Sequence, residues 1–170
     1  MTRPVDYSVD SIHTQAWLPE IGKLIVNFGA IEAHTYWWIA ALTGDPSESR
    51  KILNRKTPFV PRVEQIEKLL KDDRWKNVKP DALDIWGRAK KMAELRNAVA
   101  HSPLVFHVAG GEETADWVGI PDFGRLRRVD TEQDSIITLE KLVESVNELC
   151  EIGERLSSLL KVIDELADDA

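Results

Sequence analysis

Residues 138–163 read TLEKLVESVNELCEIGERLSSLLKVI, and this stretch decides the fold class. Its apolar side chains recur at alternating intervals of four and three residues, which predicts a helix whose apolar seam packs against other helices. Thr138 suits the cap at the start of this helix. We expect Cys150, which falls within the apolar pattern, to be a small core residue. The seam positions are Leu142, Val146, Leu149, Gly153, Leu156, Leu160 and Ile163.

Helical periodicity also appears upstream of this stretch. A long helix is predicted between Pro19, which suits a first turn, and Gly44, which suits a stop. A short helix should follow at Asp45-Pro46-Ser47-Glu48, where an aspartate cap precedes a proline. Helices are also predicted over 63–70 and 80–102, the latter ending because a proline follows. The apolar positions of the first helix are Ile21, Leu24, Ile25, Phe28, Ile31, Thr35, Trp38, Ile39 and Leu42.

The segment 104–130 interrupts the helical pattern. Residues 104–108 and 116–120 look strand-like and are separated by Gly110-Gly111, and 126–129 resembles a third short strand. We therefore expect a hairpin and loop excursion before the last helix. The whole pattern predicts an all-α fold, an antiparallel helical bundle of four principal helices with one short β-hairpin excursion.

Composition places this bundle in one domain, residues 17–167, between an arm at 1–16 and a tail at 168–170. The chain has 170 residues, one cysteine and a formal net charge of -7. A single cysteine excludes a disulfide within the chain. No stretch has the roughly 18 apolar residues that a membrane span needs, and residues 1–10 lack the apolar core of a signal peptide, so we expect a soluble, cytoplasmic protein without membrane partners. The acidic balance argues against broad adhesion to nucleic acid and leaves room for a locally basic site.

Residues 93–102 read AELRNAVAHS and combine side chains suited to phosphoryl transfer. At about 100° per residue, Arg96, Asn97 and His101 fall within one arc of roughly 140° on the helix. An imidazole can serve as general acid or base near neutral pH, and a guanidinium can hold a phosphate through two hydrogen bonds. Glu94 extends this polar row, and Ser102 closes the helix end before the proline.

The run from Arg96 to His101, RNAVAH, resembles the motif of the HEPN superfamily, an arginine followed by a polar residue and then a histidine. Residues 28–32, FGAIE, are similar to the first helix of some HEPN subfamilies, and the resemblance covers 17–165. It implies a dimeric helical bundle and a metal-independent endoribonuclease, of the kind that serves as a toxin or defence effector with a protein antitoxin. In such an enzyme His101 would be the acid/base, Arg96 the phosphate binder and Asn97 the positioning group.

Two other functions remain open on the sequence. One is a non-catalytic module of the same class that dimerises and binds a nucleotide, RNA or a protein. The other is an unrelated helical scaffold, in which Arg96 and His101 only cap a helix. In a dimer, the small side chains of Ala93 and Ala100 would let the fourth helix of one copy lie against the fourth helix of the other.

Several residues outside the motif are candidates for supporting roles. Glu32 lies among apolar positions and is expected either to pair with Arg96 or His101 or to lie at the solvent edge. His34 should face solvent or pack on Trp37. The cluster Arg125, Arg127 and Arg128 would either grip an RNA backbone or form a solvated strand face.

The tryptophans divide into two groups by their expected location. Trp37, Trp38 and Trp86 are expected to pack the bundle, and Trp17, Trp75 and Trp117 are candidates for either an exposed stacking surface or the core. The sequence has no HExxH, CxxC or glycine-rich phosphate loop, and His13 and His107 have no partners at metal spacing. We therefore predict neither a metal nor a nucleotide cofactor.

Overall fold

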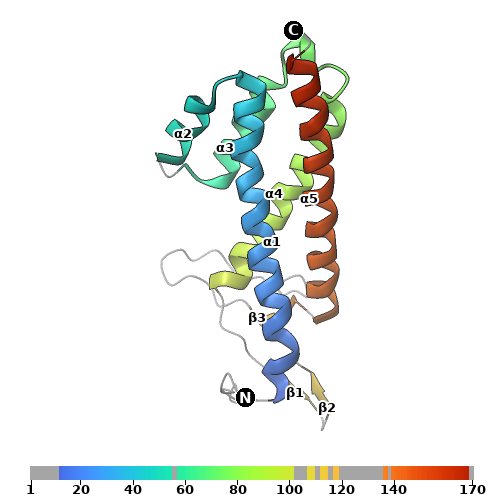
Figure 1. The fold of residues 1–170 in the computed structure, drawn as a ribbon. Coiled ribbons are helices and arrows are strands. Elements are labelled where there is room, and N and C mark those ends of the chain that lie inside the picture. The colour runs from blue at the N-terminus through green and yellow to red at the C-terminus, as the bar shows by residue number, and fades with distance from the viewer. Residues whose placement is uncertain are drawn as a thin grey trace. The chain divides into compact units, whose positions relative to one another are not determined.

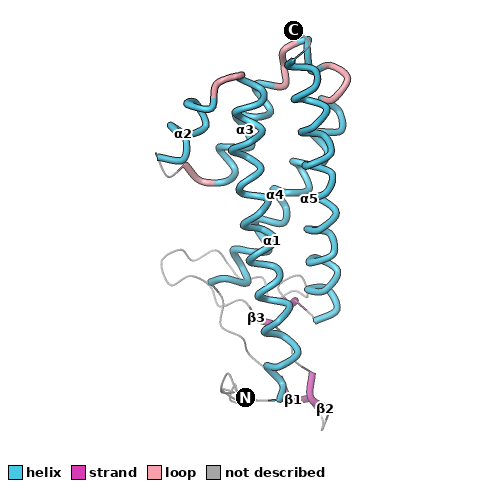
Figure 2. Tube along the Cα trace, viewed as in Figure 1, coloured by secondary structure: helices cyan, strands magenta, loops and turns pink. Residues whose placement is uncertain are grey.

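The computed structural model describes residues 12–54, 57–101, 107–109, 112–114, 117–118, 136–137 and 139–168, and this part of the chain is mostly helical (Figures 1 and 2). An all-α fold was predicted, and this class is confirmed. The helices are α1 (Ile12–Thr43), α2 (Pro46–Asn54), α3 (Phe59–Leu69), the short 3-10 helix η1 (Asp73–Trp75), α4 (Lys79–His101) and α5 (Leu139–Asp168).

Within the described residues, four very short strands lie between α4 and α5. β1 (His107–Ala109) pairs antiparallel with β2 (Glu112–Thr114), and β3 (Trp117–Val118) pairs antiparallel with β4 (Ile136–Ile137). The predicted segments 104–108 and 116–120 overlap β1 and β3, but these two do not pair with each other. The predicted strand at 126–129 lies outside the described residues.

The chain divides into two compact units. The first comprises residues 1–26 and 94–147, and the second comprises 27–93 and 148–170. In the first unit the described core side chains come from the start of α1, the end of α4, strand β4 and the start of α5. They are Trp17, Leu24, Val99, Ile137, Leu142 and Val146.

Aromatic contacts join the helices of the second unit. The ring of Phe28 on α1 meets that of Phe59 on α3 edge-on, with the centroids 5.0 Å apart. The ring of Trp38 on α1 also meets that of Trp86 on α4 edge-on, with the centroids 5.5 Å apart. Trp38 Nε1–H also donates a hydrogen bond to the Leu156 carbonyl on α5 at 3.2 Å. Because buried indoles bring large apolar area and one N–H donor, these contacts hold α1, α3, α4 and α5 around one core.

Ion pairs cover the seam between α4 and α5 in this unit. Arg88 Nε donates to Glu148 Oε1 at 3.1 Å, and its Nη1 donates to Glu151 Oε1 at 2.9 Å. The hydrogen bond from Arg88 lowers the pKa of Glu151. Since these side chains are partly exposed to water, we expect the pairs to add little to the stability of the fold.

The turn between α1 and α2 follows the local sequence as predicted. Gly44 ends α1 with a backbone φ of 65°, a left-handed conformation that glycine adopts without strain. Asp45 then accepts a hydrogen bond from the Ser47 backbone N–H at 2.7 Å, and helix α2 starts at Pro46. This bonding to Ser47 lowers the pKa of Asp45, as expected for a capping carboxylate.

Two helix starts differ from the prediction. Helix α1 begins at Ile12, so it extends into the predicted arm, and Pro19 lies inside the helix rather than in its first turn. A proline inside a helix removes one backbone hydrogen bond. Trp17, two residues before this proline, is only 1% exposed, so this part of α1 contributes to the core of the first unit. Helix α3 begins at Phe59, so Pro61 lies in its first turn instead of before it.

Burial corrects several expectations about single side chains. Trp17 and Trp75 are buried, which leaves neither of them for an exposed stacking surface, whereas Trp37 is 48% exposed and was expected in the core. On α1, Trp37 lies about 100° from Trp38 on the side away from the buried Thr35 and Ile39, so Trp37 points out of the core. Cys150 is next to the buried Leu149 but on the side away from the buried Ile152, so it is exposed and not a core residue.

Within the described residues, no helix is both long enough and apolar enough to cross a bilayer. The charged side chains along α4 and α5 account for this result, because a span needs about 20 mainly apolar residues in a row.

Two neighbouring residues of α4 provide a test of the core. Ile85 is fully buried and Leu83 is 37% exposed. Ile85→Ala should lower the free energy of unfolding by about 2–5 kcal/mol, because it removes buried methyl groups and leaves a cavity. Leu83→Ala should lower it by less than about 1 kcal/mol. Urea unfolding followed by circular dichroism measures both, and equal losses would contradict this assignment of the core.

Candidate functional site

The end of α4 presents the predicted motif on a continuous helix. The helix extends through His101, one residue short of the predicted end, so the i to i+4 spacing of Asn97 and His101 lies on regular helical backbone. Val99 is buried at 3% exposure and anchors this last turn, while Asn97 and Ala100 are exposed. Because Cβ positions four residues apart share one helix face, the backbone places the histidine one turn beyond the amide.

Arg96 and Asn97 contact each other at this helix end. Arg96 Nη1–H donates a hydrogen bond to Asn97 Oδ1, with the two atoms 2.8 Å apart. Arg96 is partly exposed to solvent, and the hydrogen bond to the Asn97 amide orients its guanidinium. A guanidinium has five N–H donors in a fixed plane, so the bond to Asn97 is compatible with bidentate phosphate binding.

The remaining residues of the predicted site divide into two groups. Glu94 is exposed on α4 and lies on the same helix as the motif. The His101 side chain, Ser102 and the arginine cluster at 125–128 lie outside the described part of the chain. Ala93 is only 5% exposed, so it does not offer the open small surface that was expected of it.

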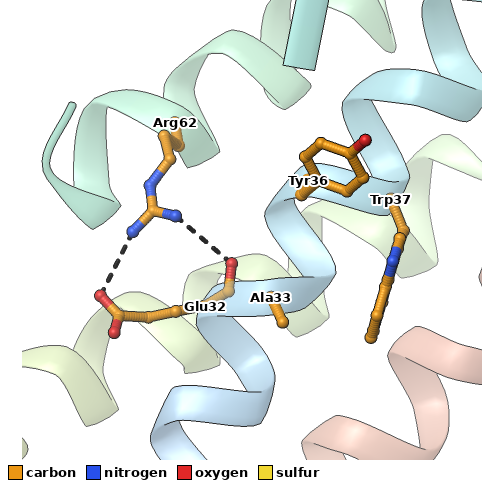
Figure 3. A pocket seen from close by; sticks show the side chains of 5 residues that line it. All are labelled: Glu32, Ala33, Tyr36, Trp37 and Arg62. Carbon is orange, nitrogen blue, oxygen red and sulfur yellow. Dashed lines mark hydrogen bonds and ion pairs between the residues drawn. The ribbon is translucent and has the colours of Figure 1, made fainter. Parts of the chain in front are cut away.

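Glu32 has a partner that the sequence did not indicate. Its Oε1 forms an ion pair with Arg62 Nη2 at 3.2 Å, and its backbone carbonyl accepts a hydrogen bond from Arg62 Nη1 at 3.4 Å (Figure 3). Arg62 Nη1 also donates to Thr35 Oγ1 at 3.1 Å. Arg62 is largely buried, with 11% of its side chain exposed. The pair therefore connects α1 to the first turn of α3, and the carboxylate that lies among apolar positions is matched by a cation.

A pocket of about 380 Å³ lies against α1 beside this pair. Its lining residues are Glu32, Ala33, Tyr36, Trp37 and Arg62 (Figure 3). The volume is in the range of ordinary ligand pockets. The half-exposed indole of Trp37 and the ring of Tyr36 give it aromatic surface, while the charges of Glu32 and Arg62 offset each other. Such a site suits an apolar or flat group better than an anion.

His34 lies next to this pocket, on the side of α5. Its ring meets Trp37 edge-on with the centroids 5.1 Å apart, so packing on Trp37 is confirmed. Ser157 Oγ lies 3.3 Å from His34 Nε2, and Nδ1 is buried without a hydrogen-bond partner in the described structure. Burial disfavours the imidazolium and lowers the pKa of His34.

The sequence reasoning missed the pocket residues Ala33, Tyr36 and Arg62, and it placed Trp37 in the core instead. A helical wheel of residues 27–43 gives a usable signal for the two aromatic residues, because it shows a second uncharged face opposite the core stripe. Nothing in the sequence signals Arg62, since its contact with Glu32 spans 30 residues. Within the described residues, no group of three or more histidine, cysteine, aspartate or glutamate side chains is arranged to hold a metal ion.

The lowered pKa of His34 predicts a pH-dependent stability. In the unfolded chain His34 binds a proton with its ordinary pKa of 6.5. In the folded chain this pKa is lower, so His34 binds the proton only at lower pH. Stability from neutral His34 is therefore present above about pH 6.5 and is lost as the pH falls below it. Urea unfolding at pH 7.5 and 5.5 should show a smaller loss of stability in His34→Gln than in wild type. An equal loss in both proteins would contradict the burial of this imidazole.

Comparison with known proteins gives no family assignment. The chain matches no family model, and neither a curated protein nor a solved structure is similar to it. The likeness to HEPN proteins therefore depends on the residues from Arg96 to His101 and on the helical setting. What that likeness implies about activity is accordingly a proposal.

Proposed function

We propose that this protein is a metal-independent endoribonuclease of the HEPN class. The observation that supports it best is the Arg96–Asn97 hydrogen bond of 2.8 Å on the last turns of α4, one turn before His101. This helix end carries a guanidinium, an amide and an imidazole. These groups can catalyse RNA cleavage in which the 2′-hydroxyl of the RNA attacks the adjacent phosphate.

In this proposal each residue has a separate role. The imidazole of His101, or of its copy in a second subunit, takes the proton of the 2′-hydroxyl, whose oxygen attacks the adjacent phosphorus. The bond from phosphorus to the 5′-oxygen breaks, and that oxygen takes a proton from the imidazolium of His101 or of its copy in the second subunit. Arg96 stabilises the negative charge of the pentacoordinate phosphorane, and Asn97 orients Arg96. The products are a 2′,3′-cyclic phosphate and a 5′-hydroxyl end.

Other parts of the chain complete this proposal. The helices form an antiparallel bundle of four principal helices with a β-hairpin excursion at 104–130, and two copies pair so that their motifs face each other. Glu94 and Ser102 support the site, and the arginines at 125–128 contact the RNA backbone. Such an enzyme acts in the cytoplasm as a toxin or defence effector, restrained by a protein antitoxin.

A second candidate function is a non-catalytic module that binds a nucleotide, RNA or a protein. The pocket beside the 48% exposed Trp37 favours it, because large exposed aromatic rings are enriched at binding surfaces. In this alternative the bond between Arg96 and Asn97 only orients the end of α4.

Cleavage of RNA in the presence of EDTA distinguishes the two functions. We expect single-stranded RNA to be cut to 2′,3′-cyclic phosphate ends, and DNA to remain intact because it lacks the nucleophile. His101→Ala should reduce the rate by about 10²–10⁴, the usual contribution of one acid/base group. Arg96→Ala should also be inactive, and Arg96→Lys should be impaired because lysine lacks the planar fork.

Matched variants control this experiment. Lys91→Ala removes one positive charge from an exposed position of the same helix and should leave the rate unchanged. Glu32→Gln tests whether Glu32 acts at the site or only holds Arg62. Full activity of His101→Ala, or cleavage that requires a metal ion, would defeat the ribonuclease proposal and favour the binding module.

A further inference from the structure

The hollow beside Glu32 follows from the spacing of three residues on α1. Ala33 has a short side chain, and Tyr36 and Trp37 come three and four residues later, so their rings lie one helical turn further along the same side. These three residues line the pocket of about 380 Å³ together with Glu32 and Arg62 (Figure 3). The pocket therefore has a floor without a bulky side chain and two aromatic rings at its border.

One of these rings is held in place by the core. The ring of Trp37 meets the imidazole of His34 edge-on, with the centroids 5.1 Å apart, while 48% of Trp37 stays exposed. His34 is only 7% exposed, and its Nε2 lies 3.3 Å from Ser157 Oγ on α5. A ring that is already positioned loses little freedom when a ligand stacks on it, so Trp37 is a preorganised binding surface.

The charges of the pocket favour an uncharged ligand. Glu32 and Arg62 form an ion pair, and Arg62 also donates to Thr35 Oγ1 at 3.1 Å. An anion would be repelled by the net charge of -7 and by the Glu32 carboxylate, which is more exposed than Arg62, at 30% against 11% of the side chain. A cation would be repelled by the guanidinium that already lines the pocket. A neutral ligand avoids both repulsions.

The two aromatic residues also provide hydrogen-bond donors. Neither the Tyr36 hydroxyl nor the Trp37 indole N–H is bonded to another residue in the described part of the chain. Each can donate to a nitrogen or carbonyl oxygen of a ligand in exchange for water. Aromatic faces beside such donors match a flat ring that carries its own acceptors.

We propose that this pocket binds an uncharged planar heterocycle of about the size of a nucleobase. The ligand stacks on the Trp37 indole and accepts a hydrogen bond from the Tyr36 hydroxyl. A volume of about 380 Å³ lies near the lower end for ligand pockets, so it suits one or two fused rings. The site uses no group of the motif from Arg96 to His101, so it does not depend on the ribonuclease proposal, and for the second candidate function it names the class of ligand.

Ligand-observed NMR with the four ribonucleosides as probes tests the site, with the full chain and no RNA. We expect saturation transfer from the protein to at least one nucleoside at millimolar concentration. Trp37→Ala should raise its dissociation constant roughly 5- to 150-fold, the usual effect of removing an aromatic ring on which a base stacks. Ala33→Leu fills the hollow with a residue that favours helix, so the chain should fold while binding is lost.

Two controls locate the ligand and its charge. Ala167→Leu makes the same change at a partly exposed alanine of α5 that does not line the pocket, and should leave the dissociation constant unchanged. Nucleoside monophosphates should bind the pocket more weakly than nucleosides, because the acidic chain repels the phosphate. The proposal is overturned if no nucleoside binds, if Trp37→Ala and Ala33→Leu bind like wild type, or if the binding that Trp37→Ala removes is tighter for the monophosphates.

Discussion

The buried indole of Trp38 is the interaction on which the second unit depends. One side chain of α1 meets the ring of Trp86 on α4 and donates its N–H to the Leu156 carbonyl on α5. The packing fixes which side of α1 faces inward, and the directional hydrogen bond limits how α5 can slide along it. The rotation of α1 in the unit follows from this one residue.

That rotation decides the exposure of the rest of α1. With Trp38 inward, Trp37 turns about 100° away and becomes half exposed, and Glu32 comes to the border of α3, where it meets Arg62. His34 turns toward α5 and loses most of its contact with water, which lowers its pKa. A pocket, an ion pair and a pH-sensitive imidazole therefore all result from how one helix is oriented.

The motif on α4 depends on a different constraint. Its residues are close in sequence, so the helix alone brings Arg96 beside Asn97, and the bond between them needs no distant partner. The buried Val99 ties this last turn to the core of the first unit. The guanidinium of Arg96 at the end of α4 is thus positioned by its neighbour on the same helix, whereas the aromatic pocket on α1 depends on contacts between helices.

The sequence by itself determined the features that local rules govern. The glycine stop and aspartate cap around residue 45, the extent of α4 and the helical class all depend on neighbours within a few positions, so they could be predicted. Only the tertiary structure decided which tryptophans are buried, that Cys150 is exposed and that Glu32 pairs with Arg62. These outcomes depend on which distant residues meet across helices, and periodicity identifies an apolar face without specifying what covers it.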